Sequence, residues 1–354
     1  MTNPVNPVHP AILSPSLLPL LALAFKSLFA EIAMNTIKKL RVFVVVALIL
    51  TLTSIDTGLA KSKKKKEALT GTPVLWQRPD DISSRDLFLG PGGEGMRPDL
   101  RRLTFIKEEK GGYSKKYRVR DASGREWVAK IGNEAQSETS AIRLLWGVGY
   151  YTEVNYLAPR VTIPGKGTFT NVRFEARPDQ WKRGDEWKWK SNPFSRTSEL
   201  QGLKIMMALI NNWDLKDSNN VIIKPHGSNR LYYVISDLGA TFGHASTTPI
   251  FWRITRSRNN PANYAKSNFF EKVKGDRVVL HFGGKNRGIM KDLTVQDAQW
   301  IASLLSQLSD QQIRDAFRAA NYSPGQINLL AGEVRERTNE LLSLTPSPRI
   351  GRGE

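Results

Sequence analysis

The sequence predicts a two-lobed α+β fold, in which a small antiparallel β lobe precedes a mainly α-helical large lobe. The chain has 354 residues, 40% of them hydrophobic, and nine tryptophans, which is enough apolar material for a folded body with a real core. Short alternating strand patterns open the folded region, and helix signals dominate its last third. Strands followed by helices in this order are typical of an α+β fold.

Three strand-like segments begin the small lobe, which we expect to span residues 101–178. Residues 103–108, 116–120 and 126–131 carry the strand patterns, with turn-forming residues between them. A helix then runs to Gly147, with Asn133 or Ser137 as its cap. Extended chain continues at 161–163 and 171–175. This order predicts an antiparallel sheet with one helix.

The large lobe is expected over residues 179–344. Residues 198–212 form a strongly apolar helix, and two short strands follow at 221–223 and 231–235. Farther on, a Ser or Thr is followed three residues later by Asp or Gln, the signature of a helix N-terminus. This signature occurs at 294–297, 309–312 and 323–326. The last ten residues, 345–354, are expected to be disordered.

A lysine ends the third strand in the run Val128-Ala129-Lys130, and Glu138 lies on the following helix. A lysine held in place by a glutamate supplies a fixed positive charge for nucleotide phosphates. Glu134 competes with Glu138 for this role, and Glu138 is preferred because it lies within the helix.

Two acidic segments follow the apolar helix. The first is a polar loop that contains Asp214, Lys216 and Asn219, and the second is Asp237-Leu238-Gly239 after a strand. A carboxylate and an amide oxygen are hard ligands that suit Mg²⁺. Asp237 and Asn219 fit as metal ligands, with Asn220 as a competitor that the spacing disfavours. Asp214 fits a base that orients a hydroxyl, and Lys216 can steady the transferring phosphate.

The spacing Asp214-x-x-x-x-Asn219, followed by Asp237-Leu238-Gly239, resembles the catalytic and metal-binding loops of the protein-kinase-like superfamily. Residues 209–214 look closer to its atypical branches: the phosphatidylinositol kinases, the HipA-type kinases and the secretory-pathway kinases. The resemblance implies a two-lobed protein-kinase-like fold, ATP and Mg²⁺ as cofactors, and phosphoryl transfer to a hydroxyl of a protein, a lipid or a sugar.

The resemblance also implies where the nucleotide would be held. The turn at Gly111 and Gly112 lies where the superfamily places a glycine-rich loop over the phosphates. Residues 174–177 would be the hinge between the lobes, and the backbone of Glu175 and Ala176 would face adenine.

Charge and composition limit the other classes of function. The chain carries 52 Lys and Arg against 33 Asp and Glu, a net charge of +19, which favours anionic partners without choosing among them. Cysteine is absent and the four histidines are not spaced as metal ligands, so a zinc site is not expected. Basic and aromatic residues alternate at 180–190. We interpret this stretch as a surface insertion whose tryptophans pack on the large lobe, with substrate docking as the alternative; no strong nucleic-acid motif occurs.

The N-terminal region has the pattern of a targeting segment. A basic patch at 38–41, an apolar run at 42–52 and a small-residue exit at 57–60 predict a signal peptide over residues 34–60, preceded by a non-native extension at 1–33. An uncleaved membrane anchor is the alternative. Residues 61–100 read as linker, in which Lys63–Lys66 are either solvated or bound to an anionic membrane surface.

These features predict an exported, periplasmic or extracellular, Mg²⁺-dependent kinase-like enzyme with a nucleotide and an unidentified hydroxyl-bearing substrate. One alternative is a catalytically weak pseudokinase that acts as a nucleotide-binding or scaffold module at the cell envelope. Another is a basic surface-binding protein without kinase chemistry.

Overall fold

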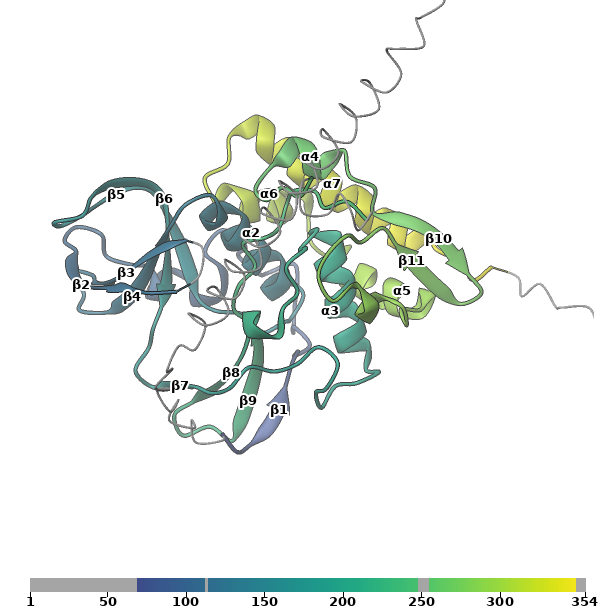
Figure 1. The fold of residues 1–354 in the computed structure, drawn as a ribbon, viewed down its shortest axis with the longest axis horizontal. Coiled ribbons are helices and arrows are strands. Elements are labelled where there is room, and N and C mark those ends of the chain that lie inside the picture. Colours follow the sequence, from purple (N-terminus) through teal and green to yellow (C-terminus); the bar gives the residue numbers. More distant parts are fainter. Residues whose placement is uncertain (1–68, 112–113, 248–254, 348–354) are drawn as a thin grey trace, which may run out of the picture. The chain divides into compact units, whose positions relative to one another are not determined.

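The structure is a computed structural model that describes residues 69–111, 114–247 and 255–347. The expected signal peptide, the polybasic residues Lys63–Lys66 and Gly112 lie outside the described residues. Elements are labelled as in Figure 1. In chain order the strands and α-helices are β1 (Thr72–Val74), β2 (Thr104–Glu109), β3 (Lys115–Arg120), β4 (Glu126–Ile131), α2 (Glu134–Gly147), β5 (Asn155–Ile163), β6 (Gly167–Ala176), β7 (Trp181–Arg183), α3 (Ser198–Leu209), β8 (Asn220–Pro225), β9 (Arg230–Ile235), α4 (Pro261–Ala265), β10 (Phe270–Lys274), β11 (Arg277–Leu280), α5 (Val295–Leu305), α6 (Asp310–Arg318) and α7 (Pro324–Ser343).

The small lobe is a five-stranded antiparallel sheet with the order β2-β3-β4-β6-β5. Side chains alternate between its two faces, as strand geometry requires. Trp127, Ala129 and Phe174 are buried in the core of this lobe. Their neighbours in sequence, Val128 and Lys130, line a cleft instead. The alternation therefore aims one face of β4 at the candidate site.

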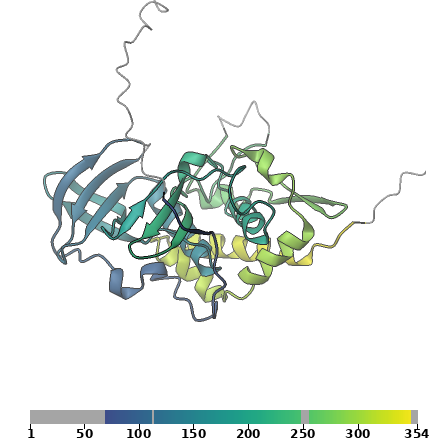
Figure 2. The ribbon, with the colours of Figure 1, turned by 90° about the horizontal axis from the view of Figure 1, so that it is seen from below.

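The large lobe combines helices with a second sheet, of order β1-β9-β8-β7. Helix α3 packs against α5, and α7 packs against α4, α5 and α6. The three expected capping boxes are all present, at the N-termini of α5, α6 and α7, with Thr294, Ser309 and Ser323 as caps. Figure 2 shows the blue strands of the small sheet grouped apart from the yellow-green C-terminal helices.

Helix α2 links the two lobes. Its side chains Ile142 and Leu145 belong to the large core, which also contains Leu203 and Met207 of α3. Glu134 and Glu138 lie one turn apart on the same helix and both contact Lys130 of the small sheet. The expected two-lobed, protein-kinase-like α+β fold is thus confirmed by its elements and their order (Figure 1).

Residues 69–100 are not a linker, in contrast to the expectation for 61–100. Strand β1 pairs in parallel with β9, and Leu75, Ile82 and Leu87 are buried in the large core. The glycines and prolines of this segment shape turns between buried anchors rather than a free connection. These widely spaced apolar residues are a weaker signal than a periodic one, which is why the pattern read as linker.

The basic and aromatic stretch packs as expected for a surface insertion. Trp187 and Trp189 are buried in the large core, and Nε1 of Trp187 donates a hydrogen bond to the carbonyl of Val234 (3.0 Å). Both rings are therefore unavailable for stacking on a ligand. In the described part of the chain, no helix has the length and apolar character needed to cross a membrane.

Candidate active site

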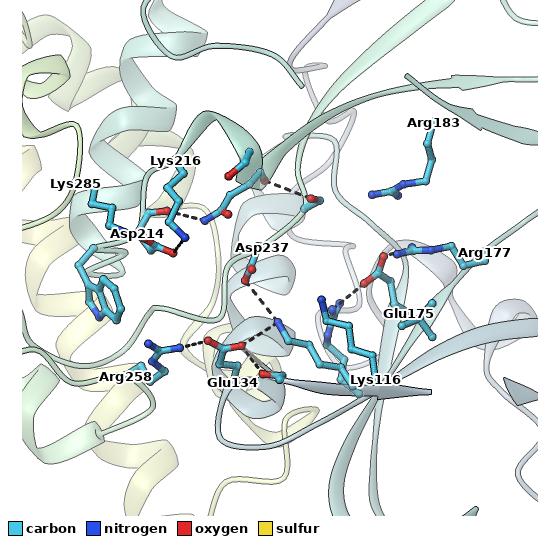
Figure 3. Close-up of a pocket in the computed structure, with 18 of the residues that line it drawn as sticks. Lys116, Glu134, Glu175, Arg177, Arg183, Asp214, Lys216, Asp237, Arg258 and Lys285 are labelled. Atoms are coloured by element: carbon cyan, nitrogen blue, oxygen red, sulfur yellow. Dashed lines mark hydrogen bonds and ion pairs between the residues drawn. The ribbon is translucent and has the colours of Figure 1, made fainter. Parts of the chain in front are cut away.

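A cleft of about 500 Å³ lies where β4 and β6 of the small lobe face the loops that follow α3 and β9 (Figure 3). It brings together Lys130, Asp214, Lys216, Asn219 and Asp237, five of the residues expected from the sequence. Its remaining lining residues are Ser114, Lys116, Val128, Glu134, Arg173, Glu175, Arg177, Arg183, Trp213, Ser218, Ser236, Arg256, Arg258 and Lys285.

Lys130 is the centre of the ion-pair network in the cleft. Its Nζ lies 2.8 Å from Oε2 of Glu138, 3.1 Å from Oε2 of Glu134 and 3.5 Å from Oδ1 of Asp237. Burial on its own would lower the pKa of Lys130, but the carboxylates of Glu138 and Asp237 outweigh it and raise the pKa above its ordinary value. Lys130 is therefore a fixed cation. Both glutamates weighed from the sequence bind it, not one alone.

The turn after β9 lies directly against helix α2. A Cβ atom added to Gly239 would lie 2.7 Å from Cβ of Glu134, so only glycine allows this approach. Ser137 Oγ donates a hydrogen bond to the carbonyl of Gly239 (2.9 Å). The glycine of the Asp237-Leu238-Gly239 segment thus fixes the distance between α2 and the turn that carries Asp237.

The loop that carries Asp214 begins where α3 ends. Asn211 adopts φ +54°, a left-handed conformation that terminates the helix. Its Nδ2 donates to the carbonyl of Gly243 (2.7 Å), and Oδ1 of Asn212 accepts from the backbone N–H of Asp214 (3.2 Å). These short-range polar contacts explain the asparagines before Asp214: they replace the helix ladder and aim the loop at the cleft.

Two lysines hold Asp214. Nζ of Lys216 lies 2.8 Å from Oδ2, and Nζ of Lys285 lies 2.6 Å from Oδ1. Burial would raise the pKa of Asp214, but the hydrogen bonds from Lys216 and Lys285 outweigh it and lower the pKa below its ordinary value of 3.8. Asp214 is therefore ionised at neutral pH, and in this arrangement it is a weak base.

Asn219 is positioned to offer an oxygen to a metal. Its Nδ2 donates to the carbonyl of Asp214 (2.6 Å), and its own carbonyl accepts from Ser236 N–H (2.8 Å). No described residue donates a hydrogen bond to its side-chain Oδ1, and Asn219 lines the cleft. Asn220 does not compete, because its Nδ2 donates to the carbonyl of Trp187 (3.0 Å) on the far side.

Asp237 combines an open carboxylate with an ion pair. Strand β9 ends at Ile235, and the Asp237 side chain keeps 42% of its surface exposed, while Oδ1 lies 3.5 Å from Nζ of Lys130. The carboxylate is therefore accessible to a ligand. In Figure 3 Asp237 lies between Asp214 and Glu134.

The donor set suits Mg²⁺ only together with a ligand's own oxygens. Within the described residues no group of three or more His, Cys, Asp or Glu side chains could hold a metal by itself. Asp237 and Asn219 would contribute two oxygens, and phosphate oxygens and waters would complete the preferred octahedron. A metal held here would therefore depend on oxygens from a bound ligand as well as on these two side chains.

The expected nucleotide contacts from the small lobe differ from the structure. Gly111 does not line the cleft; Ser114 of the same turn does, and its Oγ donates to Oε2 of Glu134 (2.6 Å). Ala176 does not line it either, because its N–H donates to the carbonyl of Val154 (2.9 Å) within the sheet. Glu175 lines the cleft with its side chain, while its backbone is paired to both neighbouring strands.

Sequence reasoning missed most of the positive charge in the cleft. Arg173 lies on β6 as the register partner of Lys130, and Arg173, Glu175 and Arg177 alternate with Phe174 and Ala176 at the end of this strand. That alternation was a readable signal. Arg258 and Lys285 come from loops with no local pattern, and only the fold brings them to the cleft.

Arg258 ties the large lobe to helix α2. Its Nη1 forms an ion pair with Oε1 of Glu134, and its guanidinium lies 4.8 Å from the centre of the Trp213 ring. Arg256 lies over the same ring at 4.7 Å. Trp213, next to Asp214, is thus the platform that positions two arginines at the mouth of the cleft.

A buried Lys–Glu pair under a small antiparallel sheet, with an Asp–Asn loop and an Asp–Leu–Gly turn opposite, is the arrangement that the resemblance to the protein-kinase-like superfamily led us to expect. No protein-family model matches the chain, and no curated protein is similar to it in sequence. Among solved structures, the crystal structure of a Helicobacter pylori proinflammatory kinase, CtkA, matches with a TM-score of 0.41 and 11% identity, covering 69% of this chain and 93% of that chain. A match at that TM-score carries no argument about function.

Proposed function

We propose that the chain is a Mg²⁺-dependent, kinase-like phosphotransferase that moves the terminal phosphoryl group of ATP to a hydroxyl. One observation carries this proposal: Lys130, Asp237, Asn219 and Asp214 all line a single cleft, although they come from three segments, one in the small lobe and two in the large lobe. Ion pairs that only stabilise the fold do not require an amide, two carboxylates and a lysine to surround a solvent-accessible cleft.

The roles follow from where charge develops during transfer. The acceptor oxygen forms a new bond to the terminal phosphorus, the bond to the bridging oxygen breaks, and ADP leaves with that electron pair. Lys130 is placed to hold the phosphates that stay with ADP. Bound Mg²⁺, held by Asp237 and Asn219, would neutralise phosphate charge. The carboxylate of Asp214 would orient the acceptor hydroxyl and take its proton.

The acceptor is a hydroxyl of a protein, a lipid or a sugar, and we place the enzyme outside the cytoplasm because of the signal-like N-terminal pattern. The excess of basic residues at the mouth of the cleft, among them Arg256 and Lys285, favours an acceptor with negative charge close to its hydroxyl.

A pseudokinase is the second candidate, and one observation favours it. Asp214 is neutralised by two lysines that lower its pKa, so in this arrangement it accepts a proton poorly. A scaffold that binds nucleotide without turnover would not require Asp214 to accept a proton. In the enzyme, phosphates and acceptor would have to draw Lys216 or Lys285 away from Asp214.

ATP consumption by the purified chain tests the proposal. We expect turnover that depends on Mg²⁺ and falls by about 100-fold or more in Asp237→Ala. Asp292→Ala is the matched control, because Asp292 is a strongly exposed acid in the large lobe whose only described ion pair is a loose surface contact with Arg277. Nucleotide-dependent thermal stabilisation without turnover would favour the pseudokinase. Equal turnover by wild type and Asp237→Ala would refute the metal role.

A further inference from the structure

The end of the cleft where a kinase would hold the nucleotide base is charged rather than apolar. We propose that this site recognises its donor through the phosphate chain and not through the base, so that ATP, GTP, CTP and inorganic tripolyphosphate bind with similar affinity. This inference rests on the proposed function and specifies the class of donor.

The cleft offers little surface for a base to stack on. Of the lining residues in the described part of the chain, only Val128 and Trp213 have apolar or aromatic side chains. The Trp213 ring already contacts two guanidinium groups, from Arg256 and Arg258. Pockets that bind flat organic groups are lined mainly by apolar and aromatic side chains, and this one is not.

The polar groups that could read the edge of a base are already engaged. The N–H of Ala176 donates to the carbonyl of Val154 (2.9 Å), and that of Arg177 donates to the carbonyl of Glu126 (3.3 Å). The carboxylate of Glu175 accepts from Arg173 (2.7 Å) and from Arg177. A nucleotide base that bound here would have to break sheet hydrogen bonds or an ion pair, and the cleft offers no stacking surface that would compensate for this loss.

The same surface suits a chain of phosphates. The described lining residues include nine Lys or Arg against four Asp or Glu. That leaves five positive charges in excess, more than the charge of a magnesium–triphosphate complex. Concentrated charge of this kind in a cleft attracts anions and focuses them there.

Arg173 provides a second observation that favours an anionic ligand. The residue is only 2% exposed, yet its Nε and Nη1 have no hydrogen-bond partner among the described residues. Its Nη2 alone is occupied, by Glu175 and Glu138. Buried guanidinium nitrogens normally find acceptors, and phosphate oxygens match their geometry. Because Arg173 and Lys130 are register partners on neighbouring strands, one phosphate chain can contact both.

Lys116 extends this line of charge along the small sheet. It is the register partner of Lys130 on β3, lines the cleft, and forms no ion pair with a described residue. Its neighbour Lys115 is exposed and lies over the Tyr117 ring, 5.3 Å from its centre, and does not line the cleft. The two lysines therefore form a matched pair: same strand, same charge, different surroundings.

Calorimetric titration in the presence of Mg²⁺ tests the proposal on the full chain. The ligands are ATP, GTP, CTP, tripolyphosphate and adenosine. We expect the four triphosphates to bind with dissociation constants within about tenfold of one another, and adenosine not to bind at the same concentrations. Binding of ATP at least ~30-fold tighter than the other three, or binding of adenosine, would overturn this inference and leave the proposed function standing. Failure of all four triphosphates to bind would overturn both.

Two variants distinguish a direct contact between Lys116 and the phosphates from the effect of the net positive charge. Lys116→Gln should weaken all four triphosphates by the same factor, about 5- to 20-fold, without changing their order. Lys115→Gln removes the same charge and should change each affinity by less than about twofold. Equal effects of the two variants would mean that the net charge attracts the ligands without a contact from Lys116, and this result would contradict the proposed mode of recognition.

Discussion

The Nζ atom of Lys130 lies 2.8 Å from Oε2 of Glu138, whose side chain is fully buried. The pair joins the sheet of the small lobe to the helix that packs on the large core. Glu134 repeats the contact one helical turn earlier and carries it on to Arg258 in the large lobe. A continuous ion network therefore joins the two lobes, and its members Lys130, Glu134 and Arg258 also line the cleft.

Substituting Lys130 should show how much this ion network contributes to the free energy of unfolding. Lys130→Met leaves the buried Glu138 with Arg173 as its remaining cationic partner (3.1 Å), so we expect the free energy of unfolding to fall by about 3 kcal/mol. Urea denaturation measures it. Lys130→Met combined with Glu138→Leu should recover part of that loss, since the buried carboxylate that lost its lysine is gone. A double variant as unstable as the sum of both single variants would show that the two residues contribute independently, and would contradict this explanation.

The contact between Gly239 and helix α2 predicts a second effect. Gly239→Ala places a methyl group 2.7 Å from Cβ of Glu134, so either the turn or the helix must move. We expect a loss of about 1–3 kcal/mol in stability and weaker nucleotide binding, because Asp237 moves with the turn. Gly332→Ala in α7 is the control: its added Cβ meets no atom within 4 Å, and alanine is the better helix former. Gly332→Ala should be neutral or stabilising in the same thermal melts.

The elements of this fold could be predicted because their signals are local. The capping boxes at Thr294, Ser309 and Ser323 depend on residues three apart, and each structure-defined cap matches its sequence pattern. Lys130 and Asp237 could be found for a similar reason, since each closes a short strand pattern. The site residues that could not be predicted are those brought to the cleft by contacts between segments that lie far apart in the sequence.

Arg258 illustrates that limit. Its partner Glu134 is 124 positions away in the chain, and nothing around Arg258 marks it as different from other exposed arginines. Strand β1 was missed for a similar reason: it pairs with β9, far along the chain, and three residues are too few to show a period. Ala176, expected as part of the hinge, does not line the cleft, because sheet pairing continues to that residue and uses its N–H.

The conformation of Asn211 yields a prediction that separates two physical causes. Asn211→Gly keeps the left-handed φ accessible but removes the bond from Nδ2 to the carbonyl of Gly243. Asn211→Ala removes the bond and also strains the backbone. We expect Asn211→Ala to be less stable than Asn211→Gly by about 1 kcal/mol, measured by chemical denaturation. If the two variants are equally stable, the side-chain bond accounts for the whole effect and the backbone strain for none.

The two lysines on Asp214 predict how the site responds to acid. Their hydrogen bonds hold the pKa of Asp214 below 3.8, so its ionised form is favoured by the folded state. The stability it contributes is present above the unfolded pKa and is lost as the pH falls through the folded value. Lys285→Gln removes one of the two contacts and leaves the effect of burial, so the pKa of Asp214 should rise. Carboxyl NMR titration should show its midpoint move to higher pH, and the acid limb of any turnover should move in the same direction. Lys291→Gln, an exposed lysine of the same lobe, is the control and should leave the midpoint in place. A midpoint that does not change in Lys285→Gln would mean that Lys216 alone sets the charge state of Asp214.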